Sequence, residues 1–163
     1  MNLKPLLPGH ILVSPLRRVQ HLADLRSDEI TDLFLTVQKV SRTLERVYSA
    51  SAFNVAVQDG VAAGQSVPHV HAHVIPRHEA DMDDRGGGDK LYELMEGEEG
   101  DVGKALREAE GSGERAYVRM PKVEEDQRKP RSMDEMQKEA EWLRGEMERD
   151  AADGEKGSST GVV

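Results

Sequence analysis

The stretch "GQSVPHVHAHVIPR", from Gly64 to Arg77, carries three histidines at alternating positions, His69, His71 and His73. The whole chain of 163 residues has six histidines, so half of them fall within five positions. Small apolar residues occupy the positions between them. A period of two is typical of a strand, in which residues i, i+2 and i+4 share one face. We therefore predict a strand over residues 69–76 with a histidine face and an apolar core face.

The geometry of a strand limits what this histidine face can do. Alternate Cα atoms lie about 6.5–7 Å apart, so the outer two histidines are roughly 13 Å apart. Two neighbours can share a metal ion, but three converging on one ion would strain a regular strand. A row suits a linear substrate such as a phosphate chain. A solvated strand rich in histidine by chance and a metal-binding site remain the alternatives.

The middle histidine is the candidate nucleophile. If Nδ1–H of His71 donates to a backbone carbonyl, Nε2 keeps the lone pair that attacks phosphorus. His69 and His73 are then expected to donate hydrogen bonds to phosphoryl oxygens. The loop before the row adds Gly64, the amide of Gln65 and the hydroxyl of Ser66, together with backbone N–H groups. Such a loop alone is an ordinary turn, but beside the row it indicates a phosphate site.

The flanking sequence predicts the other elements of an α+β fold. "HILVSPL" (10–16) and "AFNVAVQDG" (52–60) are typical of strands, and the short loop after the second makes it an antiparallel neighbour of the histidine strand. Between them, an amphipathic helix capped by Ser27 is expected. Its apolar stripe comprises Ile30, Leu33, Phe34, Val37, Val40, Leu44, Val47 and Tyr48.

The sequence after residue 78 changes character. Residues 79–130 contain 16 acidic and 9 basic residues and eight glycines, and we expect a mobile insert there. Only "KLYELM" (90–95) predicts a brief helix and "AYVRM" (116–120) a brief extended piece. Ser132 and Glu135 form a capping box for a C-terminal helix over residues 131–149, expected to dock on the sheet. Residues 150–163 are expected to be a disordered tail.

The amino-acid composition limits the kinds of molecule that the protein is expected to bind. The net charge of −9 argues against nucleic acid, which needs a basic surface. The absence of cysteine excludes disulfides and thiolate metal sites and fits a reducing compartment. No segment approaches the roughly 20 apolar residues of a membrane span. We therefore expect no membrane partner and a cytoplasmic location, with the nucleus as a second one.

The stretch from Gly64 to Arg77 resembles the histidine-triad (HIT) motif, in which three histidines alternate with apolar residues. The flanking "KPLLPGHILVSPLRRVQHLADLRSDEITDLF" and "VQDGVAAGQ", and the C-terminal "RSMDEMQKEAEWLR", resemble the Fhit branch of that family, the dinucleoside polyphosphate hydrolases. The resemblance covers residues 2–78 and about 130–145. It implies a HIT catalytic core over residues 1–78, with an antiparallel sheet flanked by a long helix and a C-terminal helix.

This resemblance also implies roles for individual residues. His71 would attack the α-phosphate of diadenosine triphosphate or a similar dinucleotide, and water would then release a monophosphate from the nucleotidyl-histidine. Gln65 would contact the bridging oxygen or leaving group, and His10 would support the catalytic row. The residues implied in substrate binding are Asn2 (near the ribose), Gln58, Gly64, Gln65, Ser66, Val67 and His73.

The resemblance further implies a homodimer without a tightly bound cofactor, in which Mg²⁺ or Mn²⁺ assists with the polyphosphate. His21 and His78 are interpreted as exposed loop residues. Arg17 and Arg18 either steer anions or are solvated surface charges, and the second interpretation is preferred.

The N-terminus departs from the family pattern. Family members have a leading hairpin before the position of Asn2, whereas here only Met1 precedes it. We expect an exposed sheet edge and an incomplete nucleoside pocket. Two further functions therefore stay open: hydrolysis of nucleoside phosphoramidates, and a nucleotide-binding sensor with weak or no turnover.

Overall fold

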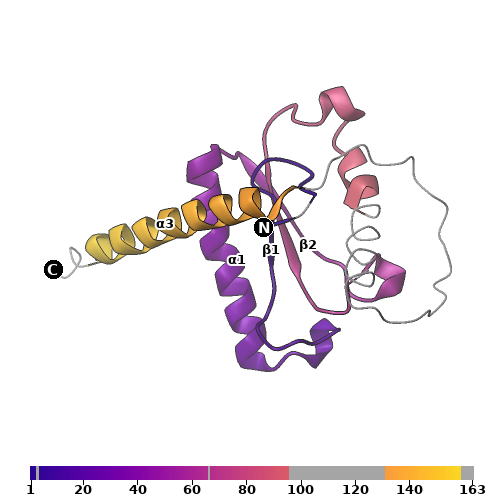
Figure 1. The fold of residues 1–163 in the computed structure, drawn as a ribbon, viewed down its shortest axis with the longest axis horizontal. Coiled ribbons are helices and arrows are strands. Elements are labelled where there is room, and N and C mark those ends of the chain that lie inside the picture. Colours follow the sequence, from indigo (N-terminus) through magenta and orange to yellow (C-terminus); the bar gives the residue numbers. More distant parts are fainter. Residues whose placement is uncertain (3, 66, 96–130, 159–163) are drawn as a thin grey trace.

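The computed structural model describes residues 1–2, 4–65, 67–95 and 131–158, with side chains described as far as residue 153. The three strands form one antiparallel sheet in the order β1-β3-β2, with helices packed around it (Figure 1). This arrangement confirms the predicted α+β class. The elements are β1 (Ile11–Val13), α1 (Ser27–Tyr48), β2 (Ala52–Val57), β3 (Ala72–Arg77) and α3 (Met133–Ser158), with short 3-10 turns at Leu22–Asp24, Val61–Ala63 and Asp83–Arg85.

The central strand β3 separates two apolar clusters, because its alternating residues point to opposite faces of the sheet. Val70, Ala72 and Val74 are fully buried against α1, as the sequence predicts for the residues between the histidines. The helix supplies the other half of this cluster through Leu33, Val37, Val40 and Leu44. The opposite face carries Ile75 and is covered by Leu6, Leu7, Met82, Leu91 and Met95.

Residues 79–95 correct the prediction of a mobile insert. They pack on the second face of the sheet, where Met82, Leu91 and Met95 are buried. Residues 90–95 are helical, as predicted for "KLYELM". The segment is fastened at the end of β3, where the guanidinium of Arg77 contacts both carboxylate oxygens of Asp81 at 2.8 Å. The rest of the predicted insert, including "AYVRM", lies outside the described residues.

Helix α1 begins one residue away from the predicted cap. Ser27 is already helical, and the flanking residue is Arg26. The backbone N–H of Arg26 donates to the carboxylate of Glu29 at 2.9 Å. The prediction of Ser27 as the cap is therefore wrong, because Glu29 supplies the acceptor at this helix end.

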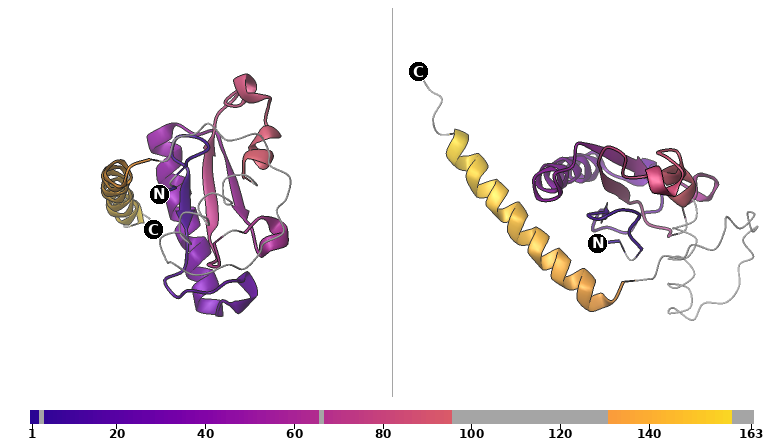
Figure 2. Two further views of the ribbon diagram at one scale, coloured as in Figure 1. Left: turned by 45° about the vertical axis from the view of Figure 1, so that its right-hand side comes forward. Right: turned by 90° about the horizontal axis from the view of Figure 1, so that it is seen from above.

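Helix α3 begins with the predicted capping box, in which Glu135 N–H donates to Ser132 Oγ and Ser132 N–H donates to the Glu135 carboxylate. The helix lies across α1, and its Leu143 reaches the core cluster that also includes Val13 of β1 and Val74 of β3. The predicted end near residue 149 is wrong, because the helix continues to Ser158 (Figure 2). The residue at the predicted start of the tail, Asp150, is held by Thr43 and Arg46.

Glycine at position 9 brings the N-terminal segment close to the sheet. Its φ is +78°, and a Cβ there would lie 2.9 Å from the Tyr48 ring and 3.0 Å from Pro76. No other residue fits both the conformation and the space. Gly9 thus sets the position of His10, the next residue, beside β3. Over the described ranges, no helix has the length and apolar character needed to cross a membrane.

Candidate active site

Two of the three histidines precede the strand that the sequence predicts for them. Strand β3 begins at Ala72, so His69 and His71 lie in the segment leading into it and His73 lies within it. Nδ1 of His71 is 2.8 Å from the backbone carbonyl oxygen of His69. A carbonyl only accepts, so neutral His71 carries its hydrogen on Nδ1 and the lone pair on Nε2. This is the tautomer that a histidine nucleophile needs.

A second hydrogen-bond chain fixes the tautomers of His10 and His73. The backbone N–H of Leu6 donates to His10 Nδ1 at 3.2 Å, so the hydrogen of neutral His10 is on Nε2. This Nε2–H donates to His73 Nδ1 at 3.0 Å, which leaves the hydrogen of His73 on Nε2. Both rings are buried, and the rings of His73 and His71 have centroids 5.1 Å apart. His10 thus lies against His73, and its role in supporting the row stays a prediction.

Asn2 lies behind this chain. Its side-chain oxygen accepts the backbone N–H of Lys4 at 2.9 Å, which orients the amide nitrogen toward the His10 ring. Asn2 is 2% exposed. In this conformation it supports His10, and contact with a ribose would use the second amide hydrogen or the remaining acceptor capacity of Oδ1.

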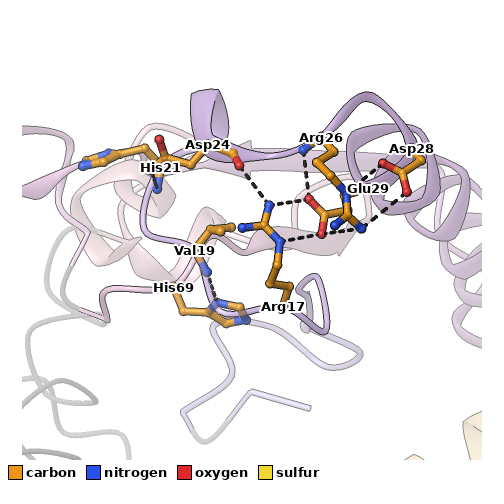
Figure 3. Close-up of polar contacts among 8 residues, drawn as sticks. All are labelled: Arg17, Val19, His21, Asp24, Arg26, Asp28, Glu29 and His69. Atoms are coloured by element: carbon orange, nitrogen blue, oxygen red, sulfur yellow. Dashed lines mark hydrogen bonds and ion pairs between the residues drawn. The ribbon is translucent and has the colours of Figure 1, made fainter.

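His69 does not have the predicted arrangement. The backbone N–H of Val19 donates to its Nδ1 at 3.3 Å (Figure 3), and its Nε2–H donates to the carbonyl of Pro15 at 3.0 Å. Both ring nitrogens are thus engaged by backbone groups. The prediction that the side chain donates to phosphate is not met, and what His69 offers the site is its own carbonyl, which orients His71.

The turn beside the row is closed by the amide of Gln65. Its Oε1 accepts the N–H of Gly60 at 2.9 Å, and its Nε2 donates to the carbonyl of Gln20 at 2.8 Å. A contact between Gln65 and a leaving group would therefore use the second amide hydrogen. Val67 follows in the turn, and its carbonyl accepts the N–H of His69 at 2.7 Å. Ser66 lies outside the described residues.

Gly64 and Gln58 lie against one another at this turn. Gly64 has a φ of +92°, and a Cβ there would be 2.5 Å from Nε2 of Gln58. Oε1 of Gln58 is buried and has no hydrogen-bond partner within the described part of the chain. A buried acceptor without a partner is costly, so Gln58 is suited to receive a hydrogen bond from a ligand.

Two side-chain contacts near the site are not predicted from the sequence. His21 Nδ1 lies 3.0 Å from Asp59 Oδ1, and His21 is partly buried rather than an exposed loop residue. Arg17 donates through Nε and Nη2 to the two carboxylate oxygens of Glu29, at 2.7 and 2.6 Å (Figure 3). Arg17 and the backbone N–H of Arg26 lower the pKa of Glu29 to about 2. The acidic start of α1 was visible in the sequence, but its partner lies in another loop.

Within the described ranges, no group of three histidine, aspartate or glutamate side chains is arranged to hold a metal ion. The rings of His69 and His71 are oriented by backbone groups, and the ring of His10 is oriented by the backbone of Leu6 and by His73. The site is therefore organised around the tautomers of its imidazoles.

An antiparallel sheet with alternating histidines beside a glycine turn defines the histidine-triad class of proteins. The family model described as the HIT domain matches residues 1–80. The asymmetrical bis(5'-nucleosyl)-tetraphosphatase of Schizosaccharomyces pombe is 47% identical over 150 residues, which cover 89% of this chain and 81% of the relative. The chain belongs to the HIT family.

Two further proteins are similar to this chain. A bis(5'-adenosyl)-triphosphatase of Saccharomyces cerevisiae is 36% identical over 171 residues, covering 91% of this chain and 81% of the relative. The solved structure of Plasmodium falciparum diadenosine triphosphate hydrolase with cyclomarin A is 38% identical, with a TM-score of 0.49 over 69% of this chain and 71% of that one.

Proposed function

We propose that this protein hydrolyses dinucleoside polyphosphates, with diadenosine triphosphate or a close analogue as substrate, through a covalent intermediate on His71. The hydrogen bond from His71 Nδ1 to the His69 carbonyl carries the proposal, because it fixes the lone pair on Nε2. The names of the two curated relatives support the substrate class.

In the first step, Nε2 of His71 attacks the α-phosphorus. A P–N bond forms while the P–O bond to the leaving nucleotide breaks, and the leaving nucleotide departs as an anion with the electron pair of that bond. His73 carries its hydrogen on Nε2 in the tautomer set by His10, and it would donate to a non-bridging phosphoryl oxygen. Charge on that oxygen is thereby stabilised in the transition state.

In the second step, water attacks the same phosphorus and the P–N bond breaks. The imidazole of His71 regains its neutral form, and a nucleoside monophosphate leaves with the water oxygen. A diadenosine triphosphate would thus give a monophosphate and a diphosphate. The oxygen of water therefore enters the monophosphate and not the diphosphate, so isotope labelling identifies the α-phosphorus as the atom attacked, while His71→Ala tests the covalent step.

Substrate binding is assigned to the turn and the strand beside it. The buried Oε1 of Gln58 would accept a hydrogen bond from a ribose hydroxyl or a base amine. Gly64 permits close approach of the backbone to phosphate, with Ser66 and Val67 completing the turn. A divalent cation, Mg²⁺ or Mn²⁺, would assist with the polyphosphate.

A homodimer is part of the proposal. Strand β2 is at one edge of the described sheet, and Val55 on it is 46% exposed. An open strand edge with an exposed apolar side chain is a surface that pairs readily with a second copy. Sedimentation analysis across a range of protein concentrations tests this part.

The experiment incubates the protein with diadenosine triphosphate in ¹⁸O-labelled water and identifies the products by mass spectrometry. We expect one label in the monophosphate and none in the diphosphate. His71→Ala should slow turnover by more than about a hundredfold, as for loss of a nucleophile. Turnover retained by His71→Ala, or label in the diphosphate, would overturn the mechanism. Cleavage only of nucleoside phosphoramidates would favour the related activity instead.

A further inference from the structure

Residues 15–20, here called the frame segment, lie directly against the catalytic motif. Four backbone groups of this segment make hydrogen bonds to it. Two of them hold the His69 ring, at Pro15 and Val19 (3.0 and 3.3 Å). The carbonyl of Val19 also accepts the N–H of Val70 at 2.8 Å, and the carbonyl of Gln20 accepts the Gln65 amide. The frame segment thus holds both ends of the motif that leads into His71.

The frame segment is in turn anchored to helix α1 by one side chain. Arg17 makes a two-pronged ion pair with Glu29, and its Nη2 also donates to the carbonyl of Asp24 at 3.0 Å (Figure 3). Glu29 is 12% exposed and belongs to the first turn of α1. It also receives the N–H of Arg26, so its carboxylate is held at a fixed place on the helix.

We propose that Arg17 and Glu29 are positioning residues for His71. Their ion pair fixes the frame segment, the frame segment holds the His69 ring, and the His69 carbonyl then selects the nucleophilic tautomer of His71. The proposal rests on the proposed function as far as turnover is concerned. The tautomer itself is a property of the free protein and does not depend on any substrate.

Loss of this ion pair should change the position of the His69 carbonyl more than it changes the free energy of unfolding. Arg17 is 45% exposed, and an ion pair at such a surface adds little to the free energy of unfolding. Its two parallel hydrogen bonds, in contrast, define the orientation of the segment closely. A displacement of the His69 carbonyl would let His71 place its hydrogen on Nε2, which removes the attacking lone pair. Misplacement of a catalytic group by about 1 Å can slow a reaction roughly a hundredfold.

The test uses Arg17→Ala, Arg17→Lys, Glu29→Gln and the double variant Arg17→Ala/Glu29→Gln. Glu29→Gln keeps an oxygen that can accept the N–H of Arg26, so the helix end is preserved. We expect kcat to fall about tenfold to a hundredfold in Arg17→Ala, with a smaller change in KM and in Tm. Arg17→Lys keeps the positive charge but cannot make the two parallel hydrogen bonds of a guanidinium, so its kcat should lie between those of Arg17→Ala and the wild-type protein. The double variant should be no slower than the worse single variant.

Arg46→Ala is the matched control. Arg46 is 47% exposed and pairs with Glu146, which is 7% exposed, so its environment resembles that of Arg17 and Glu29. It contacts α3 instead of the frame segment, and its substitution should leave kcat unchanged. A fall in kcat shared by Arg46→Ala, or wild-type kcat in Arg17→Ala, would overturn the proposal.

A second readout separates this inference from the proposed function. Nitrogen-15 NMR of the imidazoles reports which ring nitrogen of His71 carries hydrogen. We expect the Nδ1–H form in the wild-type protein and a mixture of the two forms in Arg17→Ala. If the wild-type protein turns over no dinucleotide, the proposed function fails while this spectrum still decides the positioning role. An unchanged His71 spectrum in Arg17→Ala would overturn that role.

Discussion

Nδ1 of His71 lies 2.8 Å from the backbone carbonyl oxygen of His69, so the tautomer of the nucleophile is set by the main chain two residues earlier. A backbone carbonyl cannot be removed by substitution. It can be moved, however, and the His69 ring is what ties this stretch of backbone to Pro15 and Val19. The two histidines therefore have different roles, although the sequence presents them as equivalent members of one row.

The first prediction separates these roles by comparing stability with turnover. His69→Ala should lower the free energy of unfolding by about 1–3 kcal/mol, since two backbone groups lose their partner, and should also slow turnover. His71→Ala should slow turnover by more than about a hundredfold with a smaller loss of stability, because it leaves the carbonyl of His69 without this hydrogen bond while the two backbone contacts of the His69 ring are kept. Urea unfolding followed by circular dichroism gives the first quantity, and product formation gives the second.

His78→Ala serves as the control for this comparison, because His78 is exposed and its side chain takes no part in the site. It should match the wild-type protein in both measurements. Equal losses of stability in His69→Ala and His71→Ala would show that the row is one structural unit, contrary to the division of roles inferred from the hydrogen bonds.

The second prediction concerns Gly64. Replacing it with alanine places a Cβ 2.5 Å from Nε2 of Gln58 and forces a side-chain-bearing residue to keep a φ of +92°. The conformation alone costs about 1–2 kcal/mol, and displacement of the Gln58 amide should add a loss of substrate affinity. We expect KM for diadenosine triphosphate to rise in Gly64→Ala.

Gly87→Ala provides a matched control, because Gly87 has a φ of +90° with nothing within 4 Å of the added Cβ. It should lose a similar amount of stability with no change in KM. The double variant Gly64→Ala/Gln58→Ala removes the clashing amide and should not lose more stability than Gly64→Ala. A KM in Gly64→Ala equal to that of Gly87→Ala would contradict the role assigned to this contact.

Local periodicity was sufficient for the strands and helices. The alternation around Val70 and Val74 predicts β3 and its core face, and the stripe from Leu33 to Leu44 predicts α1. Periodicity did not predict that residues 79–95 pack on the sheet, because their few apolar side chains are spread among many charged residues and glycines. Leu91 and Met95 are spaced one helical turn apart, which is the signal that could have shown this packing.

Only those features of the site that depend on residues close together in the sequence were predictable. The spacing of His69, His71 and His73 and the following strand identify the motif. Arg17 pairs with Glu29 and His21 with Asp59, and in each pair the two side chains come from separate segments of the chain. No periodicity links such positions, because their proximity depends on where the loops lie after folding. The capture of His69 by backbone groups has the same cause.

The third prediction tests the packing of residues 79–95. Leu91 is fully buried in the cluster on the second face of the sheet, so Leu91→Ala should cost about 2–4 kcal/mol. Leu94 is only partly buried at the edge of this cluster, and Leu94→Ala should cost less. Equilibrium unfolding in urea measures both. Equal and negligible costs would mean that this segment contributes nothing to the folded state.

The fourth prediction concerns the docking of α3 at low pH. Arg46 and, second, Thr43 stabilise the Asp150 carboxylate and lower its pKa below the ordinary value of 3.8. A lowered folded-state pKa means that this contribution is complete above that ordinary value and is lost as the pH falls through the lower one. Glu146 also pairs with Arg46 and with Arg149, so the interface keeps other ionic contacts.

Trp142 reports this docking, because it is the only tryptophan in the chain and its ring meets that of Tyr48 edge-on at 5.9 Å. We expect its emission to shift to longer wavelength only as the pH falls below 3.8 and through the lowered pKa of Asp150, where the carboxylate becomes protonated. Asp150→Asn removes the titrating group and should show part of the shift already at neutral pH. An emission spectrum that follows only global unfolding, and is identical in Asp150→Asn, would show that this carboxylate does not hold α3 in place.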